Sequence, residues 1–63
     1  MKYNLKEVRQ SREISQKELA KRSGVPRATI CGIETGAKDN VTVKTLQALA
    51  SALGVQLSDL ILP

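Results

Sequence analysis

The sequence predicts an all-α fold, with five short helices in one compact domain that spans residues 1–63. Two observations predict it. Helix-starting and helix-ending residues recur at short intervals, with Ser15 and Thr42 among the N-caps and Gly24, Gly36 and Gly54 among the stops. Between them, apolar side chains return at the spacing of a helix that buries one face. A chain of 63 residues has room for five such helices but not for a second domain.

The first helix is expected to run from Leu5 to about Arg12. Asn4 and Glu7 can cap its start, because an Asn side chain followed three residues later by Glu satisfies the free N–H groups there. Leu5 and Val8, three residues apart, are expected to face the core.

A second helix is expected from Gln16, because Ser15 and Glu18 have the spacing of a capping box. Ile14, just before the cap, should pack as a hydrophobic staple against this start. Gly24 supplies the left-handed backbone conformation that ends the helix.

The third helix follows after a tight turn. Pro26 lies where it begins, at a position that tolerates a missing N–H, and it should run to about Thr35 before Gly36 stops it. Two such short helices must cross closely, and small or apolar side chains are expected to fill the angle between them. These are Leu19, Ala20, Val25, Ile30 and Ile33.

A fourth helix is predicted over Val43 to Leu53, capped by Thr42 and ended by Gly54. Ser58 is expected to cap a fifth, short helix over the residues that follow it. The apolar face of the fourth helix is expected to consist of Val43, Leu46, Leu49, Ala50 and Leu53.

Composition argues against an enzyme. The chain has one cysteine and no histidine, which leaves no internal disulfide, no expected metal site and no Ser/His or Cys/His pair for catalysis. No glycine-rich phosphate loop is present, and no cofactor is expected. No apolar run approaches the length of a membrane span, and the amphipathic N-terminus is unlike a signal peptide. We therefore expect a soluble, cytoplasmic protein that does not bind a membrane.

The charge is unevenly distributed. Ten basic residues and five acidic ones lie between Lys2 and Lys44, a net charge of +5, whereas the stretch from Thr45 to Pro63 carries only Asp59. One part of the chain therefore favours a polyanion and the other favours apolar packing. With Tyr3 as the sole aromatic residue, single-strand binding by base stacking is disfavoured.

The stretch ISQKELAKRSGVPRATICGIETGAKDN resembles the helix-turn-helix of the Cro and phage-repressor type, the lambda-repressor-like (Xre) family, and TVKTLQALASALGV resembles the fourth helix of that family. Counted from Gln16, the motif has alanine fifth, glycine ninth, valine tenth and isoleucine fifteenth and eighteenth. The resemblance extends from Leu5 to Leu60 and implies a helix-turn-helix over residues 15–35. It implies double-stranded DNA as the partner, in a prokaryotic cell or as a phage product.

The third helix must bury Ile30 and Ile33, so its opposite face presents Arg27, Ala28, Cys31 and Gly32. Helix-turn-helix proteins place the start of this helix in the major groove. Arg27 is the only long donor there, and it can bond O6 and N7 of a guanine or a phosphate. Ala28 can touch a thymine methyl group.

The resemblance also implies backbone contacts. Gln16 would meet a phosphate at the start of the second helix, and Lys38, Asn40 and Thr42 would hold further phosphates. Lys44 is a weaker candidate. The complete set of expected DNA-contacting residues is Gln16, Lys17, Pro26, Arg27, Ala28, Thr29, Cys31, Gly32, Lys38, Asn40 and Thr42.

Some positions leave alternatives open. Members of the family commonly carry a long polar side chain where this chain has Gly32, so either the backbone approaches DNA, another surface packs there, or specificity is modest. Ser23 replaces a usual apolar residue. Arg9 is expected to pair with Glu34, with two solvated charges as the alternative, and Cys31 is expected to lie half exposed without a special role.

The C-terminal segment predicts a homodimer. Leu60, Ile61 and Leu62 are consecutive apolar residues. On a helix these three side chains cannot all face one core, so at least one should meet a partner or solvent. The expected interface comprises Val55, Leu57, Leu60, Ile61 and Leu62. A monomer with a frayed apolar end is the alternative.

These observations favour a DNA-binding transcriptional regulator, acting as a homodimeric repressor on an inverted repeat. The alternative is a protein-interaction module of the same fold, an antirepressor or antitoxin-type partner with little DNA binding. Ala28 and Gly32 favour that alternative, whereas the basic half of the chain and Arg27 oppose it.

Overall fold

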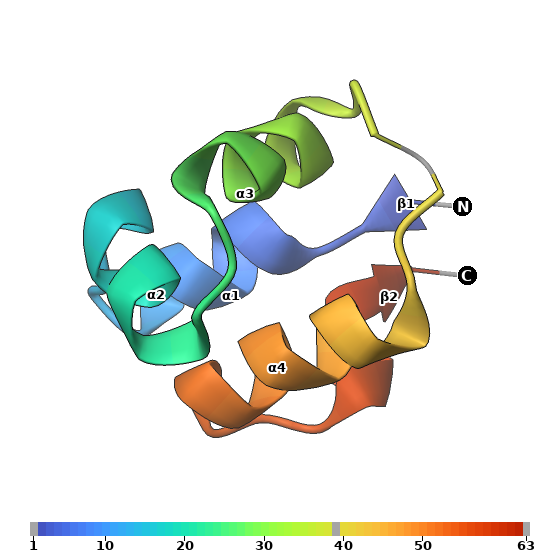
Figure 1. Ribbon diagram of the computed structural model, residues 1–63. Helices are drawn as coiled ribbons and strands as arrows, with labels where there is room; N and C mark the ends of the chain where they lie inside the picture. Colours follow the sequence, from blue (N-terminus) through green and yellow to red (C-terminus); the bar gives the residue numbers. More distant parts are fainter. Residues whose placement is uncertain (1, 39, 63) are drawn as a thin grey trace.

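The computed structural model describes residues 2–38 and 40–62. Four α-helices form most of it, and a one-turn helix and a two-stranded ribbon complete it (Figure 1). The elements are β1 (Lys2–Tyr3), α1 (Leu5–Ser11), α2 (Gln16–Ser23), α3 (Arg27–Thr35), α4 (Val43–Leu53), the 3-10 helix η1 (Leu57–Leu60) and β2 (Ile61–Leu62). Within this part of the chain, no helix is long and apolar enough to cross a membrane.

The pair α2 and α3 forms as the local signals predict. The Glu18 N–H donates to the Ser15 hydroxyl oxygen at 3.0 Å, and α2 begins at Gln16. Gly24 ends α2 with φ of 76°, and Gly36 ends α3 with φ of 83°. Both values lie in the left-handed region that only glycine adopts without strain. The two helices meet at a steep angle, and α4 lies below both of them in Figure 1.

The core lies between these helices and confirms most of the expected apolar face. Val43 is the exception, because it is 60% exposed. Ala20 is half-buried and packs against the core. The buried core side chains are Leu5, Leu19, Val25, Ile30, Ile33, Leu46, Leu49, Ala50, Leu53 and Leu60.

The prediction of a fifth α-helix is wrong. The segment forms one 3-10 turn, and its N-cap is Gln56 instead of Ser58: the Gln56 N–H donates to the Asp59 carboxylate. The chain then becomes extended at Ile61 and pairs antiparallel with β1, with Tyr3 opposite Ile61. The two ends of the described chain, Lys2 and Leu62, consequently lie side by side (Figure 1). Pairing with the N-terminal strand satisfies backbone groups that a single further helical turn would leave unbonded.

The start and end of α1 also differ from expectation. The Asn4 side chain makes no capping bond; its backbone N–H instead donates to the Leu60 carbonyl at 2.8 Å. The helix ends at Ser11, and Glu13 takes a left-handed conformation with φ of 56°. The Ile14 N–H donates to the Arg9 carbonyl, which makes this end a Schellman motif with a residue other than glycine at its left-handed position.

Candidate nucleic-acid interface

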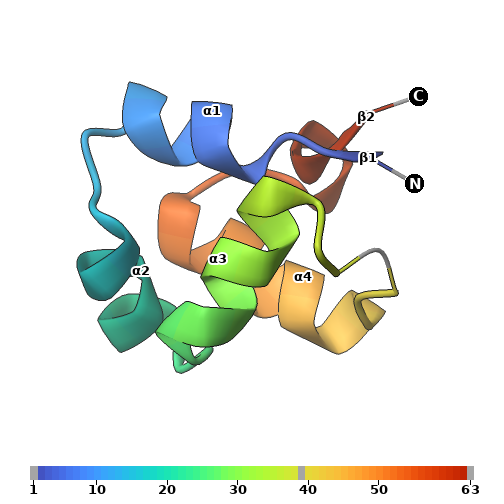
Figure 2. The ribbon, with the colours of Figure 1, turned by 90° about the horizontal axis from the view of Figure 1, so that it is seen from above.

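The outward face of α3 carries the residues that the sequence predicts. Arg27, Ala28 and Cys31 are exposed, while Ile30 and Ile33 on the opposite face are buried. Viewed from above, α3 crosses the front of the molecule, and no other helix or strand lies over it (Figure 2). Pro26 is exposed at the N-cap position, so α3 begins one residue later than expected. The short side chains of Ala28 and Cys31 leave Arg27 as the one long donor that α3 itself presents.

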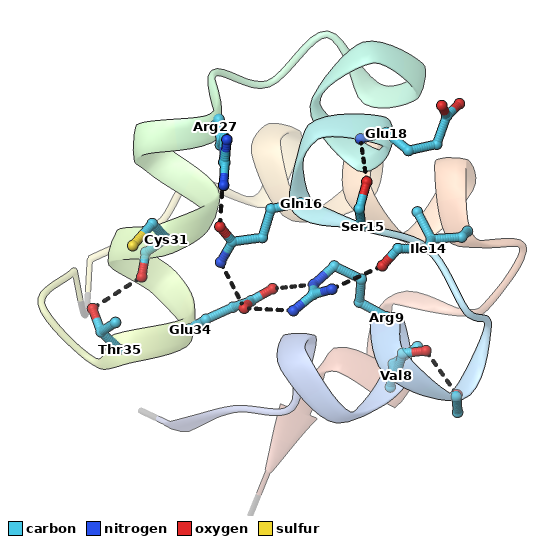
Figure 3. A network of polar contacts seen from close by, with 11 residues as sticks. Val8, Arg9, Ile14, Ser15, Gln16, Glu18, Arg27, Cys31, Glu34 and Thr35 are labelled. Atoms are coloured by element: carbon cyan, nitrogen blue, oxygen red, sulfur yellow. Dashed lines mark hydrogen bonds and ion pairs between the residues drawn. The ribbon is translucent and has the colours of Figure 1, made fainter.

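A hydrogen-bond network connects α1, α2 and α3 behind this face (Figure 3). The guanidinium of Arg9 donates from Nε to Glu34 Oε2 at 2.7 Å and from Nη2 to Oε1 at 3.1 Å. It also donates from Nη1 to the Ile14 carbonyl at 2.8 Å. The predicted pairing of Arg9 and Glu34 is confirmed, and side-chain exposures of 11% and 3% place it away from bulk water.

The network stabilises the charged form of Glu34. Burial of the carboxyl group by itself raises its pKa, because desolvation disfavours a charge. The hydrogen bonds from Arg9 and Gln16 and the positive charges of Arg9 and Lys6 outweigh this effect, so the pKa of Glu34 lies below its ordinary value. The carboxylate is therefore ionised at neutral pH.

Gln16 extends the network to the α3 surface. Its Nε2 donates to Glu34 Oε1 at 3.0 Å, and its Oε1 accepts from Arg27 Nε at 3.4 Å. The sequence places Gln16 at the start of α2 but gives no sign of this contact with a carboxylate 18 residues away. Lys17 beside it is exposed. The Arg27 guanidinium is thus held only by a long hydrogen bond and stays available at the surface.

A shallow pocket between α3 and the start of α4 brings together four more of the predicted residues: Thr29, Lys38, Asn40 and Thr42. Among the described residues, Val41 and Thr45 also line it. The Thr42 hydroxyl accepts from the Thr45 N–H at 3.2 Å, so it caps α4 as predicted while facing the pocket. Thr45 was not among the predicted site residues, although its place one turn into α4 could have suggested it.

Gly32 is covered by a side chain from the following loop. A β-carbon built on Gly32 would lie 3.0 Å from Cγ of Lys38, 3.3 Å from Cδ and 3.6 Å from Cε. The Lys38 backbone N–H donates to the Gly32 carbonyl at 2.9 Å. Of the three explanations that the sequence leaves open for this glycine, the structure supports packing of another surface.

The residues expected at a dimer interface are divided by the structure. Leu60 is fully buried in the protomer's own core and offers no surface to a partner, because the 3-10 turn directs it inward. Val55, Leu57 and Ile61 are half-buried, and Val55 packs against the same core. Leu62 is 40% exposed.

The comparisons with known proteins agree with this geometry. A model of a helix-turn-helix family matches residues 5–60. Among solved structures, the chain is similar to the restriction-modification controller protein C.AhdI from Aeromonas hydrophila, with 34% sequence identity and a TM-score of 0.82 over 87% of this chain and 82% of that one. No curated protein matches. The chain therefore belongs to the lambda-repressor-like (Xre) helix-turn-helix family of DNA-binding transcriptional regulators, which are typically not enzymes.

Proposed function

We propose that this protein is a sequence-specific repressor that binds an inverted repeat in double-stranded DNA as a homodimer, with α3 in the major groove. One observation carries the proposal. The exposed face of α3, with Arg27 at its start, lies beside a pocket lined by Lys38, Asn40 and Thr42. A base-reading helix flanked by donors for the phosphate backbone is the arrangement that helix-turn-helix docking uses.

The proposal gives these residues different tasks. Arg27 reads a base, because it is exposed at the end of α3 that enters the groove and can donate two bonds to guanine O6 and N7. Lys17, Asn40 and Thr42 hold phosphates from the start of α2 and from the loop before α4. Gln16 orients Arg27 and lies at the same helix start, where free N–H groups favour an anion.

The homodimer is proposed from the C-terminal ribbon. Leu62 is 40% exposed on β2, and Leu57 and Ile61 in the same C-terminal segment are half-buried, so this segment keeps some apolar surface open to solvent. Covering it with a second copy would bury this surface on both protomers. A two-fold contact there can place two copies of α3 roughly 34 Å apart, one DNA turn.

The alternative, a protein-interaction module without DNA binding, draws on Ala28 and Gly32 as positions without a reading side chain. That argument weakens because Lys38 lies over Gly32 and brings a cation to the α3 surface. Similarity to a restriction-modification controller protein further supports a regulatory role for this chain.

Selection of bound sequences from random duplexes at about 150 mM salt tests the function. The proposal expects an enriched inverted repeat for the wild type and relaxed preference at one base pair per half-site for Arg27→Ala, at a cost of about 1–3 kcal/mol. A wild-type protein that enriches no sequence would favour the interaction module instead.

Sedimentation at micromolar concentration tests the dimer. The wild type is expected to have a mass near twice 6.8 kDa, and Leu62→Lys is expected to halve it. Val43→Lys is the matched control, since Val43 is the other large apolar residue exposed in the described part of the chain but lies on α4. A monomeric wild type that also occupies its DNA site as one copy would reject the dimer.

A further inference from the structure

The helix α3 lacks a side chain at Gly32, and Lys38 lies across that position. The aliphatic part of Lys38 follows the helix surface, with Cγ, Cδ and Cε all within 3.6 Å of the place where a β-carbon of Gly32 would be. Gly32 does not have the positive φ that requires glycine at Gly24, Gly36 and Gly54. The backbone conformation at position 32 therefore does not require glycine. Glycine instead leaves room for the Lys38 side chain.

Lys38 lies beside α3. Besides touching Gly32 it lines the pocket with Thr29, which is one helical turn closer to the start of α3. The hydrogen bond from the Lys38 N–H to the Gly32 carbonyl fixes the root of the side chain at the end of the same helix. Cε lies 3.6 Å from the β-carbon position and the ammonium is one bond of about 1.5 Å further, so the charge lies within about 5 Å of it.

No carboxylate neutralises this ammonium within residues 2–38 and 40–62, where the ion pairs are Arg9 with Glu34 and Arg22 with Glu18. Among the described residues, this ammonium therefore has no ion-pair partner that would compete with an acceptor on DNA. A long polar side chain rooted at Gly32 would also place its polar group within about 5 Å of its own β-carbon.

We infer that Lys38 reads a base in the major groove, in place of the side chain that Gly32 lacks, and does not serve only as a phosphate clamp. The acceptors that suit a lysine ammonium there are O6 and N7 of guanine. Packing of the aliphatic part on Gly32 limits the rotamers of Lys38 before binding, which lowers the entropy lost when the ammonium meets the base. The inference rests on the proposed function, and its test separates the two.

The test compares four variants in the same duplex selection: Lys38→Ala, Gly32→Ala, the double variant, and Lys21→Ala as a control that removes an exposed positive charge from the end of α2. Gly32→Ala keeps the charge of Lys38 but places a methyl group 3.0 Å from its Cγ, so the lysine side chain must shift by a few tenths of an ångström to make room. Alanine is the better helix former, so this variant is expected to fold.

If Lys38 reads a base, Lys38→Ala loses discrimination at one base pair per half-site by about 5- to 150-fold, and Gly32→Ala loses a smaller part of the discrimination at the same base pair, because the lysine keeps its charge but must shift. The double variant then loses no more than Lys38→Ala alone. The dependence of binding on salt stays nearly unchanged in Gly32→Ala, and Lys21→Ala keeps the wild-type sequence preference.

A phosphate role gives a different result. Lys38→Ala would then weaken binding to all sequences alike and lower the salt slope by about 1, and Gly32→Ala would leave the preferred sequence as it is. Either finding overturns the inference while the proposed function stands. A wild type that prefers no sequence would overturn the proposed function, and the inference with it.

Discussion

Removing Arg9 from its ion pair with Glu34 is expected to take away a large part of the domain's stability. In Arg9→Met the carboxylate, at 3% exposure, keeps only the donor from Gln16, and the Ile14 carbonyl loses its donor from Arg9. Stranding one charge of a buried pair costs about 3–5 kcal/mol. This pair is partly buried, so a loss near the lower end of that range is expected. A protein of 63 residues has roughly 3–9 kcal/mol in total, so the variant is expected to lose a large fraction of its stability.

A double-mutant cycle measured by urea unfolding separates this charge effect from lost packing. Arg9→Met and Glu34→Leu each strand one partner, whereas the double variant replaces both charges with apolar groups. It should therefore recover at least about 2 kcal/mol relative to the sum of the single losses. The pair between Arg22 and Glu18 is a matched control: its Nε to Oε2 distance is 2.8 Å against 2.7 Å, but both side chains are about half exposed.

Acid pH gives the second measurement on the same variant. Arg9→Met removes a group that lowers the pKa of folded Glu34, so its carboxyl group takes up a proton at a higher pH than in the wild type. The gap in unfolding free energy between the two proteins should therefore narrow as the pH falls through this range. A gap that is constant with pH, together with a coupling energy no larger than that of the control pair, would refute the reasoning.

Three further outcomes are expected. Folding lowers the pKa of Glu34, so the ionised carboxylate stabilises the fold at pH values above the ordinary pKa, and this stabilisation is lost as the pH falls through the lowered pKa. Measured by urea unfolding between about pH 6 and pH 2, the unfolding free energy of Glu34→Gln should therefore decline less steeply than that of the wild type. Leu60→Ala should lower the unfolding free energy by about 2–5 kcal/mol, because Leu60 is fully buried, and a loss below about 1 kcal/mol would place it outside the core. Glu13→Gly should raise the unfolding free energy by about 0.5 kcal/mol or more, and with it the midpoint of thermal unfolding, because a φ of 56° strains any residue with a β-carbon. An unchanged or lower midpoint would contradict this.

The helices that the sequence predicts well are those with strong local signals at their ends. Ser15 and Thr42 cap α2 and α4 through bonds three residues away, and glycines end them, so the bounds of α4 match the prediction at both ends. Such bonds form within one turn and need no knowledge of the rest of the fold.

The C-terminal segment could not be predicted in this way, because its partners are distant in the sequence. Whether residues 57–62 continue as a helix depends on the N-terminal strand, where the Asn4 N–H donates to Leu60 and Tyr3 pairs with Ile61. Leu60 consequently moves from the expected dimer interface to the core. Helical spacing likewise could not show that Val43 is exposed, because the spacing does not reveal where the neighbouring helices end.

In the candidate site, too, some features follow from local sequence signals and others depend on contacts between distant residues. Exposure of Arg27, Ala28 and Cys31 follows from the need to bury the opposite face of α3, which the sequence reveals. The place of Lys38 does not, because a glycine in a helix does not indicate which side chain fills the space above it. The contact between Gln16 and Glu34 also arises only from the way that α2 crosses α3.

The order of donors and acceptors in the network decides how Gln16 can act on Arg27. A carboxylate only accepts hydrogen bonds and a guanidinium only donates them. Once Arg9 holds Glu34 in place, the Gln16 amide must turn its NH2 group to Glu34, and its oxygen is left to face Arg27. The contact to Arg27 is the longest of the series at 3.4 Å, whereas those to Glu34 are 2.7–3.1 Å. In the proposed complex, Arg27 can therefore exchange Gln16 for an acceptor on DNA while the interactions that hold α1 against α3 remain intact.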